Sequence, residues 1–303
     1  MAMRVAVIGI GSNSVRMLLA DVAAGRMTRL SRDREGTRLF AGLDEQKNLS
    51  AVAMATTAAA VARMADAARQ AGAEEIRLFA TSATRDAANK AEFAAMLEDQ
   101  AGLKLEICSG DEEAALSFYG ASGGGNCGVI DIGGGSTEVI VGSGMDIRCA
   151  FSCQMGAVRL SRQLPIRDHG DLPHVEAAAA ELLQEQLRLH PALTIPETWR
   201  GTGGTFTTLA AISRGVHWTE RTFMHGTTLS LAEVERIARM LADMPVSARR
   251  ELPGLQPNRA DIIVHGICIL LACMHTLGVS AITVSEYGNL DGYIRHRYGA
   301  EDR

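Results

Sequence analysis

"VIGIGSNSVRMLLADV" (residues 7–22) and "VIDIGGGSTEVIVGSG" (residues 129–144) follow the same pattern. Each stretch has an apolar run, a turn of small residues and a second apolar run, which is typical of a β-hairpin. Gly9 aligns with Asp131, so the two copies lie 122 residues apart, about the length of one domain. An internal repeat of this length predicts two related α/β domains that each begin with a hairpin.

The segments after each hairpin alternate between strand and helix patterns. We expect two short strands within residues 27–40, and a helix over 172–189. The glycine-rich, aperiodic stretch 120–126 is typical of a domain boundary. The sequence therefore predicts a first domain over residues 1–122 and a second over 123–290.

The composition is that of an ordinary globular protein, with 303 residues, 47% hydrophobic residues and 21% charged residues. The net charge of −5 does not favour nucleic-acid binding, so a polyanionic ligand needs a local basic patch. We find no signal peptide, no membrane-spanning stretch and no CxxC pair among the six cysteines. These features predict a cytoplasmic protein with reduced thiols and no membrane partner.

The turns of the two hairpins are candidate phosphate-binding loops. The first consists of Gly11, Ser12, Asn13 and Ser14, and the second of Gly133, Gly134, Gly135 and Ser136. Glycine-rich turns expose backbone N–H groups that can hold phosphate oxygens, although a single such turn is typical of any hairpin. Two turns facing each other across a cleft would hold a phosphoryl chain from both sides. A third turn, within residues 201–211, either adds donors or begins a helix.

Three carboxylates are candidates for the chemistry. Asp131 ends a strand before the second turn, where a carboxylate either binds Mg²⁺ beside phosphate or caps the turn. Glu138 either supports the cation or water, or is a solvated strand residue. Ser109 and Glu112 fit a capping box, a task for which Glu113 is not needed, so Glu113 is the third candidate.

Several stretches occur in the order found in the exopolyphosphatase/guanosine pentaphosphate phosphohydrolase (Ppx/GppA) family, which the chain resembles over almost its whole length. They are "GIGSNSVRMLLADV", "ATSATRDAAN", "SGDEEA", "DIGGGSTEVIVG", "GTGGTFTTLAAI", "RADIIVHG" and "VSEYGNLDGYI". The resemblance implies the short type of the family, with two ribonuclease-H-like domains of the actin-like ATPase superfamily around a cleft. It also implies that the last helix, about 290–303, completes the first domain.

The resemblance implies roles for particular residues. Glu113 would activate water, and Arg85 would bind phosphate. Arg16 and Arg259 would bind the nucleotide guanosine tetraphosphate. Mg²⁺, or Mn²⁺ in its place, would be bound by Asp131 and Glu138, and a homodimer is the family's expected assembly.

Two positions depart from the family pattern. Gly9 stands where the first turn normally has aspartate, and Leu290 stands where the closing motif commonly has arginine. The internal repeat shows the first departure by itself, since Asp131 is the counterpart of Gly9. Loss of the first carboxylate predicts weaker binding of the cation.

Three functions stay open from the sequence. The leading one is hydrolysis of terminal phosphoanhydride bonds in inorganic polyphosphate, in guanosine pentaphosphate, or in both. The second is a sensor that binds (p)ppGpp or polyphosphate with little or no turnover, which Gly9 favours. The third is a small-molecule kinase of the same superfamily, which ranks below the others. The run Arg29, Arg32, Arg34 and Arg38 either guides an anionic chain or forms an exposed strand face.

Overall fold

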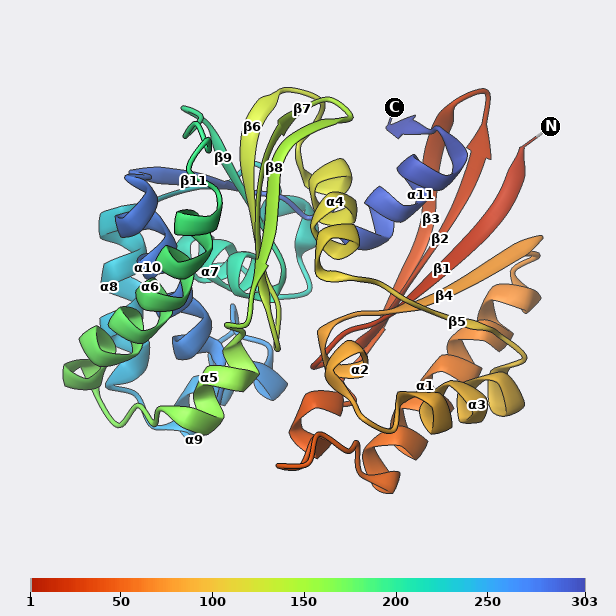
Figure 1. Cartoon of the computed structure of the whole chain (residues 1–303), viewed down its shortest axis with the longest axis horizontal. Coiled ribbons are helices and arrows are strands. Elements are labelled where there is room, and N and C mark those ends of the chain that lie inside the picture. Colours follow the sequence, from red (N-terminus) through yellow and green to blue (C-terminus); the bar gives the residue numbers. More distant parts are fainter. Residues whose placement is uncertain (1, 303) are drawn as a thin grey trace. The chain divides into compact units, whose positions relative to one another are not determined.

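The computed structural model describes residues 2–302, and the chain divides into two compact units. The first unit comprises Met1–Gly120 and Asn289–Arg303, and the second comprises Ala121–Gly288. Each unit contains a six-stranded mixed sheet with helices packed against it (Figure 1). The division after Gly120 falls inside the glycine-rich stretch 120–126 of the sequence.

The sheet of the first unit has the strand order β12-β3-β2-β1-β4-β5. Its strands are β1 (Met3–Ile10), β2 (Val15–Ala23), β3 (Arg26–Glu35), β4 (Glu75–Ala80), β5 (Leu105–Ile107) and β12 (Glu301–Asp302). The first three strands form an antiparallel meander, whereas β4 runs parallel to β1 and β5 runs parallel to β4. The carboxyl ends of β1, β4 and β5 therefore meet at one edge, where open α/β sheets bind ligands.

The helices of the first unit cover both faces of this sheet (Figure 1). They are α1 (Ala51–Gln70), α2 (Ser82–Asp86), α3 (Lys90–Ala101), α4 (Gly110–Ala121) and α11 (Asn289–Tyr298), with the short 3₁₀ turn η1 (Leu39–Gly42). Helix α11 contacts β1 and β2, and its Tyr293 and Ile294 belong to a buried cluster with Val5 and Leu18. Gly292 lets α11 approach α4 closely, since a Cβ there would overlap the carbonyl oxygen of Leu116.

Residues 27–40 differ from the expectation of two short strands. They contain most of one long strand, β3, followed by η1. Strand β3 pairs with β2 along its whole length, from Val15 opposite Glu35 to Ala23 opposite Arg26. The pairing shifts register once, between Leu19 and Ala20 of β2. The expectation was wrong because a bulge lets a strand continue through a break in its alternating pattern.

The sheet of the second unit has the order β10-β11-β9-β6-β7-β8. Its strands are β6 (Asn126–Ile132), β7 (Thr137–Ser143), β8 (Asp146–Cys153), β9 (Trp199–Thr202), β10 (Thr228–Ser230) and β11 (Ala281–Val284). Strands β8-β7-β6-β9-β11 repeat the order and directions of β3-β2-β1-β4-β5. The repeat predicted from the two hairpins therefore extends to five strands in each unit.

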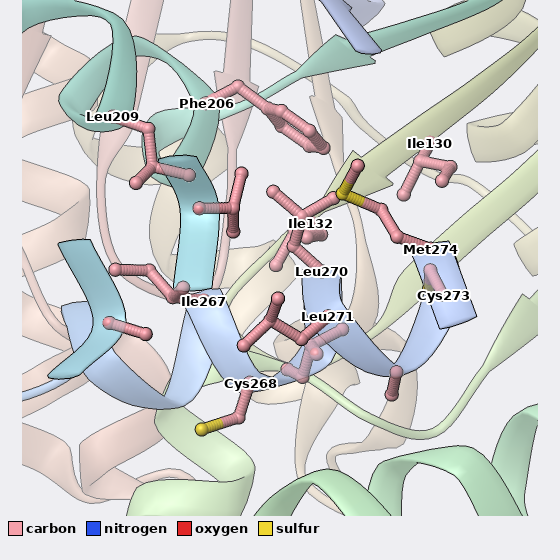
Figure 2. Close-up of a cluster of buried hydrophobic side chains, with 14 of the residues drawn as sticks. Ile130, Ile132, Phe206, Leu209, Ile267, Cys268, Leu270, Leu271, Cys273 and Met274 are labelled. Atoms are coloured by element: carbon pink, nitrogen blue, oxygen red, sulfur yellow. The ribbon is translucent and has the colours of Figure 1, made fainter. Parts of the chain in front are cut away.

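The core of the second unit is built around one apolar helix. The helices are α5 (Ala157–Gln163), α6 (Leu172–Leu189), α7 (Gly204–Arg214), α8 (Leu231–Ala242), α9 (Val246–Arg250) and α10 (Ile263–Leu277), with the 3₁₀ turns η2 (His169–Asp171), η3 (Arg221–Phe223) and η4 (Pro257–Arg259). Figure 2 shows side chains of α10 such as Leu270 and Met274 beside Ile132 of β6 and Phe206 of α7. Within residues 2–302, no helix combines the length and apolarity that a bilayer crossing needs.

Candidate functional site

The turns of the two hairpins have the same backbone geometry. The Gly11 N–H donates to the Ser14 carbonyl oxygen at 3.0 Å, and the Gly133 N–H donates to the Ser136 carbonyl oxygen at 3.0 Å. A Cβ on Gly133 would lie only 3.0 Å from that oxygen, so the turn is tight enough to favour glycine. The equivalence seen in the two sequences is therefore also present in the hydrogen bonds.

Backbone N–H groups from neighbouring segments donate hydrogen bonds to the carbonyl oxygens of each turn. In the first unit, the Arg38 N–H donates to Asn13 and the Phe40 N–H donates to Ser12, at 3.1 and 2.9 Å. In the second unit, N–H groups at the start of α5 donate to Gly133 and Gly134 at 2.9–3.0 Å. These bonds fix the conformation in which the turns present their remaining N–H groups.

Three loops meet at the edge of the first sheet where β1, β4 and β5 end. The Thr81 N–H donates to the Ile10 carbonyl at 3.1 Å, and the Cys108 N–H donates to the Ala80 carbonyl at 2.9 Å. The first turn follows β1, α2 follows β4 and α4 follows β5. This edge brings candidate residues from separate parts of the sequence together.

Arg85 and Glu113 form an ion pair at this edge. Arg85 lies within α2, and its Nη1 lies 3.0 Å from Glu113 Oε2 on α4 and donates to the Cys108 carbonyl at 3.1 Å. Glu113 is 7% exposed, so the ion pair is largely shielded from water. The hydrogen bond between these oppositely charged groups fixes the position of the Glu113 carboxylate at this edge.

The first turn of α4 explains why Glu113 is available. The Ser109 N–H donates to Glu112 Oε2 at 2.7 Å, and the Glu112 N–H donates to Ser109 Oγ at 3.1 Å. The predicted capping box is confirmed, and it occupies Glu112 while Glu113 turns to Arg85. Burial, and then the negative charge of Glu113, raise the pKa of the neighbouring Cys108 thiol to about 12, which keeps that thiol protonated.

The second hairpin carries two carboxylates directly opposite each other. Asp131 on β6 pairs in register with Glu138 on β7, and Glu138 is 1% exposed. Ser152 on β8 donates to Glu138 Oε1 at 2.7 Å. The interpretation of Glu138 as a solvated strand residue is therefore wrong. Like charges directly opposite destabilise a sheet, so this arrangement favours a cation.

The donor set fits Mg²⁺ or Mn²⁺ held jointly with a phosphate substrate. Among residues 2–302 there is no cluster of three or more histidine, cysteine, aspartate or glutamate side chains suited to a metal. Mg²⁺ commonly uses only one or two protein carboxylates, completing its shell with water and substrate phosphate. Asp131 and Glu138 provide that number of hard oxygen ligands.

The third small-residue turn begins α7, which was one of its two expected roles. Gly203 has φ 100°, and a Cβ there would lie 3.0 Å from Asp131 Oδ1. A Cβ on Gly204 would overlap the guanidinium of Arg259, whose Nε donates to Gln256 at 3.3 Å. The two glycines therefore let the chain pass close to both Asp131 and Arg259.

The corresponding place in the first unit is apolar. Gly9 pairs with Arg16 across β1 and β2, as Asp131 pairs with Glu138. A Cβ on Gly9 would lie 3.0 Å from Leu290 Cδ2 and 3.1 Å from Phe79 Cζ. The two positions that depart from the family pattern thus meet, and apolar side chains occupy the space beside Gly9.

The arginines of β3 are not a simple exposed face. Arg29 Nη2 and Arg32 Nη2 lie 2.5 and 3.2 Å from the carboxylate of Asp291, whose side chain is 4% exposed. The Arg34 Nε donates to Ser14 Oγ of the first turn at 3.2 Å. The interpretation as an exposed strand face is wrong for Arg29 and Arg32, which bind α11 to the sheet.

Two polar residues at these strand ends were missed by the sequence analysis. Ser82 precedes Arg85 by three residues on α2, and Thr202 pairs in register with Asp131. The spacing of Ser82 and Arg85 on one helix was the available signal, because residues three apart share a helix face. Thr202 lies in the third small-residue turn, within residues 201–211, but its pairing with Asp131 had no local signal because the two residues are far apart in the sequence.

Comparison with known proteins places the chain in a family. The model of the Ppx/GppA phosphatase family matches residues 18–299. Exopolyphosphatase 2 of Mycobacterium tuberculosis is 35% identical over 312 positions, covering 95% of this chain and 97% of that protein.

Solved structures agree with this result. An exopolyphosphatase-like protein matches with a TM-score of 0.88 and 27% identity, covering 98% of each chain. The Aquifex aeolicus member of the Ppx/GppA family matches with a TM-score of 0.82 and 25% identity, again over 98% of each chain. The fold class expected from the sequence is confirmed as the two-domain α/β architecture of the actin-like type. The chain belongs to the Ppx/GppA phosphatase family.

Proposed function

We propose that the protein is a hydrolase that releases terminal phosphate from inorganic polyphosphate and from guanosine pentaphosphate. The observation that carries the proposal is the partly buried Arg85–Glu113 ion pair, at 3.0 Å, at the edge where three strands of the first sheet end. The name of the exopolyphosphatase from M. tuberculosis, 35% identical to this chain, supports polyphosphate as the substrate.

In the proposed reaction, Glu113 orients a water molecule and accepts one of its protons. The water oxygen forms a bond to the terminal phosphorus, while the bond from that phosphorus to the bridging oxygen breaks. The shortened chain departs with the electron pair of the broken bond. Arg85 and the backbone N–H groups of both turns stabilise the negative charge on the phosphoryl oxygens, which is the main requirement of phosphoryl transfer.

Asp131 and Glu138 would hold Mg²⁺ or Mn²⁺ in this proposal. A cation held by these two carboxylates would neutralise phosphate charge that they would otherwise repel. The hydrogen bond from Ser152, at 2.7 Å, orients Glu138. A carboxylate that is ordered in this way would lose little entropy on binding a cation, which favours binding.

Arg16 and Arg259 are proposed to bind the phosphates of the alarmone. Arg259 is 8% exposed, and Gln256 holds its guanidinium in place. A guanidinium that is ordered before binding suits bidentate contacts with phosphate. Arg16 occupies the place in the first hairpin that Glu138 occupies in the second, so it brings positive charge where the second unit has negative charge.

The test compares phosphate release from polyphosphate by the wild-type protein and by Glu113→Gln in the presence of Mg²⁺. Glutamine keeps the shape of the side chain but cannot accept the proton, so we expect the rate to fall about 100- to 10,000-fold. Glu112→Gln, one residue away in the capping box, is the matched control and should stay near the wild-type rate. Equal rates for wild type and Glu113→Gln would exclude Glu113 as the base. Parallel assays with guanosine pentaphosphate compare the two substrates.

A sensor without turnover is the second candidate, and one observation favours it. Leu290 and Phe79 occupy the space beside Gly9, so the first hairpin supplies no carboxylate to a cation. Calorimetry with guanosine tetraphosphate, guanosine pentaphosphate and polyphosphate separates the two functions. Tight binding with no phosphate release in Mg²⁺ or Mn²⁺ selects the sensor, whereas release that depends on Glu113 excludes it.

A further inference from the structure

Buried hydrogen-bond donors without a partner within residues 2–302 gather at the edge of the first sheet, and three of them lie on neighbouring segments. These three are Asn13 Nδ2, Ser82 Oγ and Arg85 Nη2. Asn13 is 7% exposed and Ser82 is 1% exposed. Native structures rarely leave buried donors unsatisfied, because each has given up its hydrogen bonds to water. Their concentration at one edge calls for a ligand.

The chain places these three donors on neighbouring segments. Asn13 belongs to the turn after β1, and Ser82 and Arg85 belong to α2 after β4. The parallel strands pair through Ile10 and Ala80, so the two segments begin side by side. The hydrogen bond between Thr81 N–H and the Ile10 carbonyl, at 3.1 Å, holds the segments together.

Ser82 lies on the same face of α2 as Arg85, whose guanidinium pairs with the proposed base Glu113. Residues three apart share a helix face, which places Ser82 with Arg85. Arg85 uses Nη1 to hold Glu113 at 3.0 Å and the Cys108 carbonyl at 3.1 Å. Its Nη2 remains for a ligand on this face.

We propose that Ser82 binds the terminal phosphoryl group of the substrate, with Oγ donating a hydrogen bond to one phosphoryl oxygen. The amide of Asn13 and Nη2 of Arg85 donate to the same group. An amide, a hydroxyl and a guanidinium are all donors, and a phosphoryl group offers several strong acceptor oxygens. This inference rests on the proposed function for the identity of the ligand and adds Ser82 to the binding residues.

The variant Ser82→Ala tests the proposal, and Thr84→Val is its matched control. The Thr84 hydroxyl is also buried and also lacks a partner within the described part of the chain, on the same helix. It lies two residues from Ser82, and therefore on a different face of α2. The two substitutions are alike in burial and in the chemistry removed, but only one removes a proposed ligand.

The measurement is calorimetric binding of tripolyphosphate, with and without Mg²⁺, together with the melting temperature of each variant. Both variants should melt at or above the wild-type temperature, because each removes a buried hydroxyl without a partner. Ser82→Ala should lose about tenfold or more in affinity, the size expected for a hydrogen bond to a charged group. Thr84→Val should bind as the wild-type protein does. If Ser82→Ala does not fold, Ser82→Cys keeps the volume and should show the same loss.

Each other outcome overturns the proposal. Wild-type affinity in Ser82→Ala shows that Ser82 is not a ligand, and equal losses in both variants show that the packing of α2 is responsible. A wild-type protein that does not bind tripolyphosphate also overturns it. The measurement does not depend on turnover, so a protein that binds tripolyphosphate through Ser82 but releases no phosphate refutes the proposed hydrolase and leaves this inference standing.

Discussion

The two hairpins have the same backbone geometry. Their side chains differ in charge along the equivalent row of paired residues that crosses each sheet. In the second unit, the row from β8 to β9 consists of Ser152, Glu138, Asp131 and Thr202. In the first unit, the equivalent row from β3 to β4 consists of Arg34, Arg16, Gly9 and Phe79. The repeated fold therefore offers oxygen ligands in one copy and guanidinium groups beside an apolar surface in the other.

The apolar part of the first row is well packed. The Phe79 ring stacks on Tyr293 with centroids 5.4 Å apart, and Leu290 lies against the backbone of Gly9. Both partners come from α11, the last helix of the chain. The comparison teaches that apolar packing occupies in one copy the place where the other copy has a carboxylate, while the Gly11–Ser14 and Gly133–Ser136 hydrogen bonds within the two turns are the same.

The largest expected effect follows from removing a carboxylate of the second row. In Asp131→Asn, we expect phosphate release in Mg²⁺ to fall about a hundredfold or more, because the proposed cation loses a charged ligand. Without Mg²⁺, the melting temperature should rise, because Asp131 no longer repels Glu138. Glu181→Gln, an exposed position on α6, is the control. An unchanged rate would break the assignment of a cation to the second hairpin.

Placing a carboxylate in the first row should have the next largest effect. Gly9→Asp introduces a charge beside Leu290 and Phe79, so the free energy of unfolding should fall by about 2–4 kcal/mol. Gly9→Ala is the control and should cost about 1 kcal/mol, because the tip of Leu290 can move away from a methyl group. Urea denaturation of both variants measures the difference. Equal stabilities would show that the space beside Gly9 accepts a carboxylate.

A third prediction concerns how stability depends on pH, which we expect to be governed in part by His265 of the second unit. Burial is the main cause that lowers the pKa of His265 below its usual 6.5, and its Nε2 lies 2.7 Å from the Leu164 carbonyl. Below pH 6.5 the unfolded chain binds a proton that the folded chain does not, so stability falls with pH, by at most about 1.4 kcal/mol per unit.

Calorimetry between pH 7 and pH 5 measures this slope. His265→Gln should flatten it, because glutamine can donate to the Leu164 carbonyl without titrating. His174→Gln removes an exposed histidine of α6 and should keep the wild-type slope. A slope that is the same in all three proteins would assign the pH dependence to other groups.

The smallest expected effect comes from the serines that close the two turns. Ser14→Ala removes the acceptor of the Arg34 Nε hydrogen bond, so we expect a loss of about 1 kcal/mol in the free energy of unfolding. The equivalent Ser136→Ala tests the second hairpin in the same way. A larger loss at Ser136 than at Ser14 would mean that the second turn depends more on its serine. Thermal denaturation of both variants measures the two losses.

Features that depend on nearby residues could be predicted from the sequence. The two hairpins, the helix over residues 172–189 and the capping box of Ser109 and Glu112 agree with the structure. Each depends on residues a few positions apart, where periodicity and turn chemistry determine the local structure. The repeat of the two hairpins also predicted two related sheets, because one pattern in one chain favours one topology.

Features that depend on distant partners could not be predicted. The burial of Glu138 depends on packing of the whole second sheet, and the pairing of Arg29 and Arg32 depends on Asp291 at the other end of the chain. The contact of Gly9 with Leu290 likewise joins the first strand to the last helix. A charged residue in an alternating strand looks the same whether it faces water or a partner.

The return of α11 to the first sheet has a consequence for biosynthesis. The second unit is continuous in sequence, so a nascent chain contains all of it once residue 288 has left the ribosome. The strands β1 to β5 of the first sheet leave the ribosome earlier. Their buried cluster, which includes Val5 and Leu18, is complete only after Tyr293 and Ile294 have been synthesised. We therefore expect the unit translated first to be the last to mature, with its exposed apolar face a target for chaperones until the final helix arrives.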